Sequence, residues 1–205
     1  MTTLQLLDLV GVATFAASGA LVAGHKKLDL FGTLVVAFVS ALGGGTVRDL
    51  LLGLTPVFWV KDTLPVSVAL ATGALTFCLM RRVLLPAKWL LFLDALGLGT
   101  FAVLGCGRAL DAGASPLIAT MMGMLSGVAG GAIRDVLCGE VPTILRAEVY
   151  ATAALAGGAL FCALEQGGVS RDGALFLGAA LTFSVRVAAL KWKIALPVAA
   201  VKGKE

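Results

Sequence analysis

The chain has 205 residues, of which 59% are hydrophobic and only 14% are charged, and its mean hydropathy is +1.00. Soluble domains are usually about half apolar and about a quarter charged, so this composition excludes a sizeable soluble domain and indicates an integral helical membrane protein. The formal net charge of +4 does not indicate nucleic-acid binding, because the basic residues lie between the apolar segments.

Apolar stretches long enough to cross a bilayer, about 20 residues each, recur along the whole chain. Residues 1–24 lack the positive start of a signal peptide and are predicted to form the first span. With the breakers between the stretches, the pattern predicts an all-α protein with seven transmembrane helices, followed by a basic cytoplasmic tail at 191–205. The predicted spans are 4–24, 28–52, 63–80, 89–108, 115–138, 147–164 and 173–190.

Lysine and arginine are distributed unequally between the two sets of predicted loops. Ten lie on one side: Lys26, Lys27, Arg81, Arg82, Lys88, Arg146, Lys191, Lys193, Lys202 and Lys204. Three lie on the other: Lys61, Arg108 and Arg171. Because cytoplasmic loops carry the excess of basic residues, the N-terminus is predicted to lie outside and the C-terminus in the cytoplasm. Arg186, near the end of the last span, is expected to extend to the membrane interface.

The strongest pattern is a duplication, since residues 1–86 and 87–172 align without a gap at a constant offset of 86. Each half holds three predicted spans, and an odd number means that the second half enters the membrane from the opposite side. The sequence therefore predicts two inverted three-helix repeats plus a seventh helix at 173–190. The matched pairs include Asp8 with Asp94, Ser40 with Ser126, Gly44-Gly45 with Gly130-Gly131, and Arg48-Asp49 with Arg134-Asp135.

Glycine clusters occupy the interiors of the second and fifth spans, just past the midpoint serines. They consist of Gly43, Gly44 and Gly45 after Ser40, and of Gly130 and Gly131 after Ser126. Backbone groups freed by a helix break are tolerated in lipid only when they are buried in protein or line a water-filled cavity. We therefore predict paired breaks near the midplane, where exposed carbonyls could replace part of a cation's hydration shell. Close helix packing through small residues is the alternative.

Charged side chains accompany the glycine clusters, and their depth predicts their partners. Counted from the span ends, Asp8 and Arg48 fall at one depth in the outer half, and Asp94 and Arg134 at one depth in the inner half. Neighbours in an Arg-Asp dipeptide point in different directions on a helix, so Asp49 and Asp135 are expected to have separate partners. A direct contact between Arg48 and Asp135 is not expected. The six charges either line a pathway or form ion pairs that join helices.

No enzyme motif is present in the sequence. It contains one histidine, His25, no second histidine to support a metal or nucleophile, and none of the Walker, HExxH or GxSxG patterns. Its four cysteines, scattered in apolar segments without CxxC spacing, are expected to be buried thiols. We therefore expect neither an enzyme, nor a cofactor, nor a structural metal site.

The gap-free duplication, the seventh span, and GGGxxRD at 43–49 with its echo GGAIRD at 130–135 resemble the prokaryotic TRIC family of trimeric intracellular cation channels, also grouped as the UPF0126-like glycine-transporter membrane family. The resemblance covers about residues 4–190. It implies a homotrimer in a bacterial cell membrane, with one K⁺ and Na⁺ pore per protomer, kinked at the two glycine clusters. The animal members' Lys-Glu-Val motif is missing, so phosphoinositide binding is not expected. The implied partners are monovalent cations and membrane lipids.

Three classes of function remain open on the sequence. A passive monovalent cation channel is the leading interpretation. A transporter of glycine or another small neutral amino acid fits the inverted repeat equally well, because half-helix N-termini could hold a carboxylate. A purely structural membrane protein is the third, which the cost of buried charge disfavours.

Overall fold

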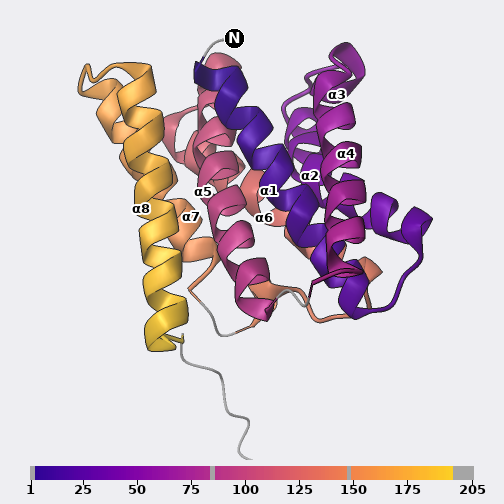
Figure 1. Cartoon of the computed structure of the whole chain (residues 1–205). Coiled ribbons are helices and arrows are strands. Elements are labelled where there is room, and N and C mark those ends of the chain that lie inside the picture. Colours follow the sequence, from indigo (N-terminus) through magenta and orange to yellow (C-terminus); the bar gives the residue numbers. More distant parts are fainter. Residues whose placement is uncertain (1–2, 84–85, 147–148, 196–205) are drawn as a thin grey trace, which may run out of the picture.

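The computed structural model describes residues 3–83, 86–146 and 149–195, and these fold into a bundle of helices (Figure 1). Within those ranges the helices are α1 (Thr3–His25), α2 (Leu30–Leu51), the short α3 (Phe58–Lys61), α4 (Leu64–Met80), α5 (Ala87–Asp111), α6 (Pro116–Leu137), α7 (Ala151–Gln166) and α8 (Arg171–Trp192), with a 3₁₀ turn η1 (Thr143–Leu145) before α7. Each predicted span coincides with one long helix, whereas α3 and η1 were not predicted.

Five of the described helices are long and apolar enough to cross a membrane: α1, α2, α5, α6 and α8. The other two long helices, α4 and α7, have 17 and 16 residues and fall short of that length. The predicted span at 147–164 begins as a helix only at Ala151, and its first two residues lie outside the described ranges. Most of the predicted tail, from residue 196 onward, also lies outside the described ranges.

Local sequence explains the helix ends. Asp29 begins α2 by accepting a hydrogen bond from the Gly32 N–H at 2.7 Å, and Pro116 stands in the first turn of α6, where no N–H is needed. Both α2 and α6 are followed by a left-handed glycine, Gly53 with φ 68° and Gly139 with φ 69°. These two glycines lie 86 residues apart, so the duplicated sequence ends its two central helices in the same way.

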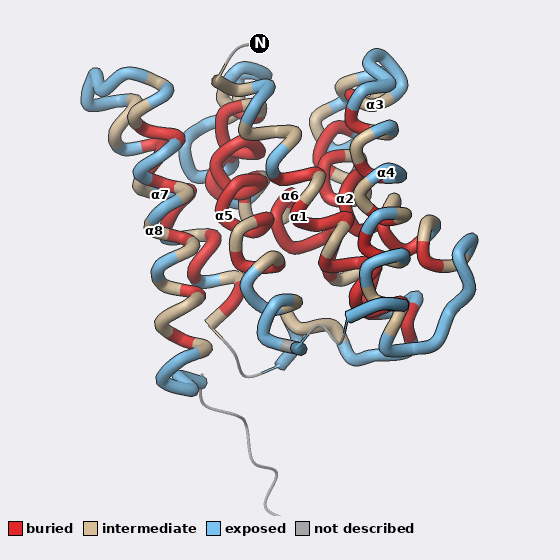
Figure 2. Tube along the Cα trace, in the orientation of Figure 1, coloured by how far each residue is buried: buried red, intermediate tan, exposed pale blue. Residues whose placement is uncertain are grey.

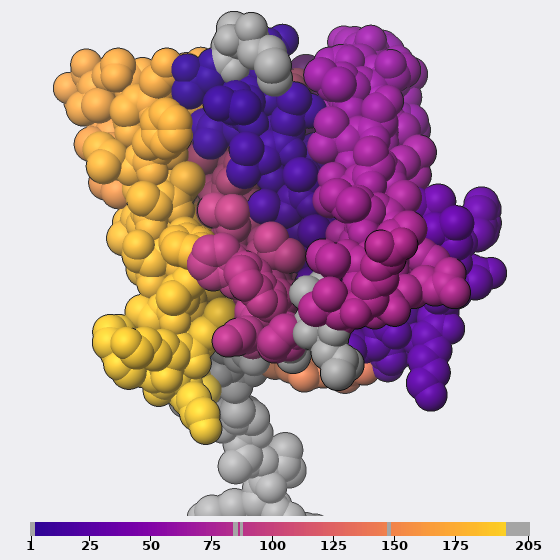
Figure 3. Space-filling model, viewed as in Figure 1, coloured from indigo at the N-terminus to yellow at the C-terminus, as the bar shows by residue number. Residues whose placement is uncertain are grey.

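Helices α1 and α5 lie side by side and run in opposite directions. The last turn of α1 and the first turns of α5, at Val22 and Leu90, line one cavity, while Leu4 and Arg108, at the other ends of the same helices, line another. Helix α4 packs beside α1 and α2, and α8 packs beside α5 and α7. In Figure 3, α4 and the α7–α8 pair flank α1 and α5 on the visible face.

The buried residues gather on α1, α2, α5 and α6, and the exposed ones on loops and outer helix faces (Figure 2). At the contact of α1 with α5, the rings of Phe15 and Phe101 stack with centroids 5.5 Å apart. Gly11 on α1 faces the Phe101 ring, and Gly97 on α5 faces the Phe15 ring. Both pairings obey the offset of 86, so the duplicated residues make duplicated contacts.

Candidate functional site

Helices α2 and α6 cross at their glycine clusters with their backbones in direct contact. A Cβ atom added to Gly44 would collide with the backbone oxygen of Ser126, and one added to Gly130 would collide with the backbone oxygen of Ser40. Ser40 and Ser126 are fully buried at this crossing. Only glycine allows this approach, so close packing accounts for Gly44 and Gly130.

The prediction that the glycine clusters break α2 and α6 is wrong. Both α2 and α6 remain α-helical through their glycine clusters, from Leu30 to Leu51 and from Pro116 to Leu137. At Gly44 and Gly130 the partner backbone fills the space where a side chain would stand. A bend at the clusters, and a pore-lining role for them, stay predictions.

The Arg134 cluster, which comprises Arg134, Asp135, Asp94 and Ser18, joins three helices at one side of this crossing. Arg134 is 3% exposed. Its Nη1 donates to Asp94 Oδ1 at 2.7 Å and to Ser18 Oγ at 2.6 Å, and its Nε donates to Asp135 Oδ1 at 2.9 Å. Asp135 Oδ2 accepts the N–H and the hydroxyl of Thr143, each at 3.0 Å. The predicted contact between Asp94 and Arg134 is confirmed.

The Arg48 cluster, which comprises Arg48, Asp49 and Ser126, lies toward the other end of the bundle. Arg48 donates through Nε and Nη2 to Asp49 Oδ1, at 2.9 and 2.7 Å, and reaches Ser126 Oγ at 3.4 Å. Asp49 Oδ2 accepts the backbone N–H of Phe58, which begins α3, at 2.9 Å. The unpredicted helix α3 therefore anchors this carboxylate.

Two predicted pairings fail. Asp8 forms no ion pair with Arg48 in the described part of the chain, and instead lines a cavity of about 90 Å³ together with Asp62. Moreover, each arginine pairs with its own neighbour, Arg48 with Asp49 at 2.7 Å and Arg134 with Asp135 at 2.8 Å. Although adjacent Cβ atoms point apart on a helix, the long arginine side chain folds back and its planar fork engages the adjacent carboxylate.

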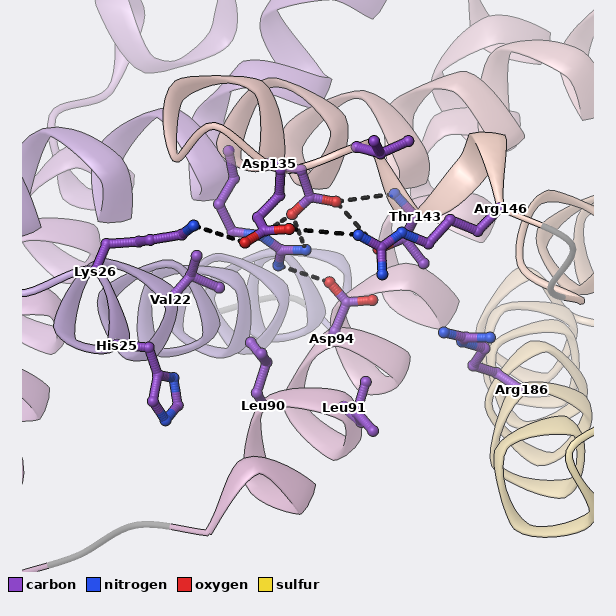
Figure 4. Close-up of a pocket in the computed structure, with 13 residues that line it drawn as sticks. Val22, His25, Lys26, Leu90, Leu91, Asp94, Asp135, Thr143, Arg146 and Arg186 are labelled. Carbon is purple, nitrogen blue, oxygen red and sulfur yellow. Dashed lines mark hydrogen bonds and ion pairs between the residues drawn. The ribbon is translucent and has the colours of Figure 1, made fainter.

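A cavity of about 280 Å³ opens beside the Arg134 cluster (Figure 4). At its edge, Glu140 accepts from Lys26 Nζ at 2.6 Å and from Arg146 Nη2 at 3.4 Å. The hydrogen bond and charge of Lys26 lower the pKa of the Glu140 carboxyl below its usual range. Charged and polar groups line the cavity: His25, Lys26, Asp94, Arg134, Asp135, Glu140, Thr143, Arg146 and Arg186.

Two aromatic residues that the sequence did not single out cover matched glycines. The ring of Phe58 lies 2.6 Å from the Cβ position of Gly45, and the hydroxyl of Tyr150 lies 3.2 Å from that of Gly131. Arg48 lies over the Phe58 ring, 5.7 Å from its centroid, and Arg186 lies over the Tyr150 ring at 4.9 Å.

Two of these residues bear on the sequence prediction. Arg186 is 1% exposed, so the expectation that it extends to the membrane interface is wrong. Tyr150 is the chain's one tyrosine, and that was the one feature of the sequence that could have singled it out. Among the described residues, no group of three or more His, Cys, Asp or Glu side chains has the arrangement of a metal site.

Comparison with known proteins agrees with this geometry. A family model described as "Glycine transporter" matches the chain twice, at residues 5–81 and 91–166. The UPF0126 inner membrane protein YadS of Escherichia coli K12 is 47% identical over 193 residues, covering 93% of each chain.

Two solved structures share the fold over nearly the whole chain. A TRIC trimeric intracellular cation channel orthologue from Rhodobacter sphaeroides has a TM-score of 0.90 and 45% identity, covering 95% of this chain and 100% of that one. A second, from a study of conductance through TRIC cation channels, has a TM-score of 0.88 and 36% identity, covering 98% of both chains. The chain belongs to the TRIC/UPF0126 family of membrane proteins.

Proposed function

We propose that the protein is a passive channel for monovalent cations, K⁺ and Na⁺, whose path passes the crossing of α2 and α6 between the Arg48 and Arg134 clusters. The observation that carries the proposal is the pair of buried charge clusters. Arg48 and Arg134 are 1% and 3% exposed, and each lies with a carboxylate beside the small-residue crossing. Ionisable groups within membrane segments are expensive and are functional candidates by default.

One of the two cavities carries charge that favours cations. The cavity beside Asp8 is lined by Gln5, Asp8, Leu9, Asp62, Leu64 and Pro65, so its charged lining residues are both acidic. Carboxylates at a channel mouth raise the local cation concentration. At the other end, the larger cavity has three acidic lining residues, Asp94, Asp135 and Glu140, among four basic ones, Lys26, Arg134, Arg146 and Arg186.

The proposal also covers how the chain crosses the membrane and how many copies assemble. The matched helix ends, the paired Phe15 and Phe101 contacts, and the opposite directions of α1 and α5 support two inverted repeats, 1–86 and 87–172, with the seventh long helix outside them. We propose seven membrane spans in a bacterial inner membrane, the N-terminus outside and the C-terminus in the cytoplasm. The TRIC relative described as trimeric supports a homotrimer, and we propose one pore per protomer, bent at the glycine clusters.

Transport of glycine is the second candidate, and the description of the matching family favours it. Helices α2 and α6, however, have no interruption that would present a half-helix N-terminus to a carboxylate. This feature favours the channel.

Flux from proteoliposomes separates the two candidates. Liposomes containing the purified protein are loaded with potassium, and potassium efflux is measured alongside uptake of labelled glycine. We expect rapid efflux that does not saturate with potassium concentration, and no glycine uptake above that of empty liposomes. Saturable glycine uptake without potassium efflux would overturn the channel in favour of the transporter.

A further inference from the structure

The two halves of the molecule differ at one matched site, where one half has an aromatic ring with a hydroxyl and the other has a ring without one. Gly45 and Gly131 correspond at the offset of 86, and each faces an aromatic ring that has an arginine over it. In one half the aromatic residue is Phe58; in the other it is Tyr150. The two do not correspond in the alignment, since position 64, which matches Tyr150, is a leucine. The sequence repeat therefore conceals this structural match.

The Tyr150 hydroxyl is buried without a hydrogen-bond partner among the described residues. The residue is 2% exposed, and its ring packs against Leu98, Ala102, Val128 and Ala154. Asp94 lies near the hydroxyl and interacts with it, and the two groups flank Gly131, with the hydroxyl 3.2 Å and Asp94 Oδ1 3.6 Å from its Cβ position. A buried hydroxyl without a partner costs free energy, so this oxygen is available to a group that the chain itself does not supply.

The neighbouring carboxylate has an available oxygen as well. Arg134 donates to Asp94 Oδ1 at 2.7 Å, while no hydrogen bond from a described residue reaches Oδ2. Asp94 also lines the large cavity, and in Figure 4 one of its oxygens makes a dashed hydrogen bond while the other points away from that bond. The carboxylate thus connects the cavity to the hydroxyl that lies behind it, beside Gly131.

We propose that Tyr150 is a selectivity-determining residue of the pathway. Its hydroxyl and the Asp94 carboxylate supply oxygen ligands to a partly dehydrated monovalent cation as it passes Gly131. Oxygen atoms are the ligands that such ions exchange for water. At Gly45 the Phe58 ring offers no such oxygen and forms an apolar barrier instead. This inference rests on the proposed channel function and adds to it an internal asymmetry.

The decisive variant is Tyr150→Phe, because it removes the hydroxyl and leaves the ring and its contact with Arg186 in place. In planar bilayers with symmetric potassium, we expect the unitary potassium current to fall by about two- to tenfold, the range that corresponds to one lost hydrogen-bond-strength contact. The reversal potential between potassium and sodium should also move, while chloride remains excluded. Phe58→Tyr should act in the opposite direction and raise the current.

Thr33→Val is the matched control. Thr33 also carries a buried hydroxyl without a partner in the described chain, but unlike the Tyr150 hydroxyl it is not among the atoms nearest to Gly45 or Gly131, so its currents should equal those of the unmodified protein. Unchanged current and reversal potential in both Tyr150→Phe and Phe58→Tyr would overturn this inference alone. Silent bilayers with the unmodified protein would overturn the channel as well. If Tyr150→Phe did not fold, Phe58→Tyr would decide the question by itself.

Discussion

The Arg48 and Arg134 clusters derive from the same duplicated sequence, but their arginines differ in the number and length of their hydrogen bonds. Arg134 binds two carboxylates and a serine, with contacts of 2.6–2.9 Å to Ser18, Asp94 and Asp135. Arg48 binds one carboxylate, and its serine contact is long, at 3.4 Å. The carboxylate that would complete it, Asp8, lies half-buried beside a small cavity. Identical motifs therefore produce one tightly bonded cluster and one open cluster, because the neighbouring residues differ.

The largest expected effect lies at the crossing that the two halves share. Gly44→Ala and Gly130→Ala each place a Cβ against a backbone oxygen that cannot move aside, so each should lower the free energy of unfolding by about 3 kcal/mol. Thermal unfolding of the purified protein in detergent measures this. Gly43→Ala is the control, since its Cβ would meet the flexible end of Ile133 at 3.2 Å. Equal melting temperatures for all three variants would contradict the backbone contact.

Removing the matched aspartates should have unequal effects. Asp94→Asn takes one of two carboxylates from the buried Arg134 and should destabilise the protein by about 3 kcal/mol. Asp8→Asn breaks no ion pair in the described chain and should cost under about 1 kcal/mol. Thermal unfolding of the two variants gives the comparison. An equal loss of stability in both variants would contradict the inference that Asp94 is bonded to its arginine and Asp8 is not.

The serines provide a finer comparison. Ser18→Ala removes a short hydrogen bond to the buried Arg134 and should cost about 1.5 kcal/mol, whereas Ser126→Ala removes the 3.4 Å contact to Arg48 and should cost less than half of that. The same melting measurement applies. A larger loss for Ser126→Ala would contradict the geometry.

The smallest expected effect is a dependence of the melting temperature on pH that arises from Glu140 in one half and has no counterpart at the matched position of the other. Lys26 lowers the pKa of Glu140 below the usual value of 4.5, so the stabilising contact is present above pH 4.5 and is lost as pH falls through the lower folded value. The position that matches Glu140 in the first half is Leu54. Glu140→Gln should remove a small part of the acid-induced fall in melting temperature. An unchanged pH profile would show that the exposed pair contributes nothing.

Much of the fold could be predicted from the sequence because membrane helices are defined by apolar length and by the breakers between them. Each of the seven predicted spans matches a long helix, and residues matched by the offset of 86 prove to make matched structure, such as the stacked Phe15 and Phe101 rings and the left-handed Gly53 and Gly139. Depth alone also predicted the contact between Asp94 and Arg134. These properties depend on spacing along the chain.

The site could be predicted only in part, because side-chain reach and unrepeated loops decided the rest. Arginine folding back onto the next aspartate does not follow from the direction of Cβ atoms. Asp49 is held by Phe58 of α3, a four-residue helix without an apolar period. Nor could spacing show that the glycine clusters would stay helical, since that depends on the partner backbone that covers Gly44 and Gly130.

A cation path between the two clusters is tested first by the reversal potential of the unmodified protein. In a planar bilayer separating unequal potassium chloride solutions, we expect unitary currents that reverse close to the potassium equilibrium potential. Currents that reverse near the chloride potential, or bilayers that stay silent while proteoliposomes of the same preparation accumulate glycine, would contradict it.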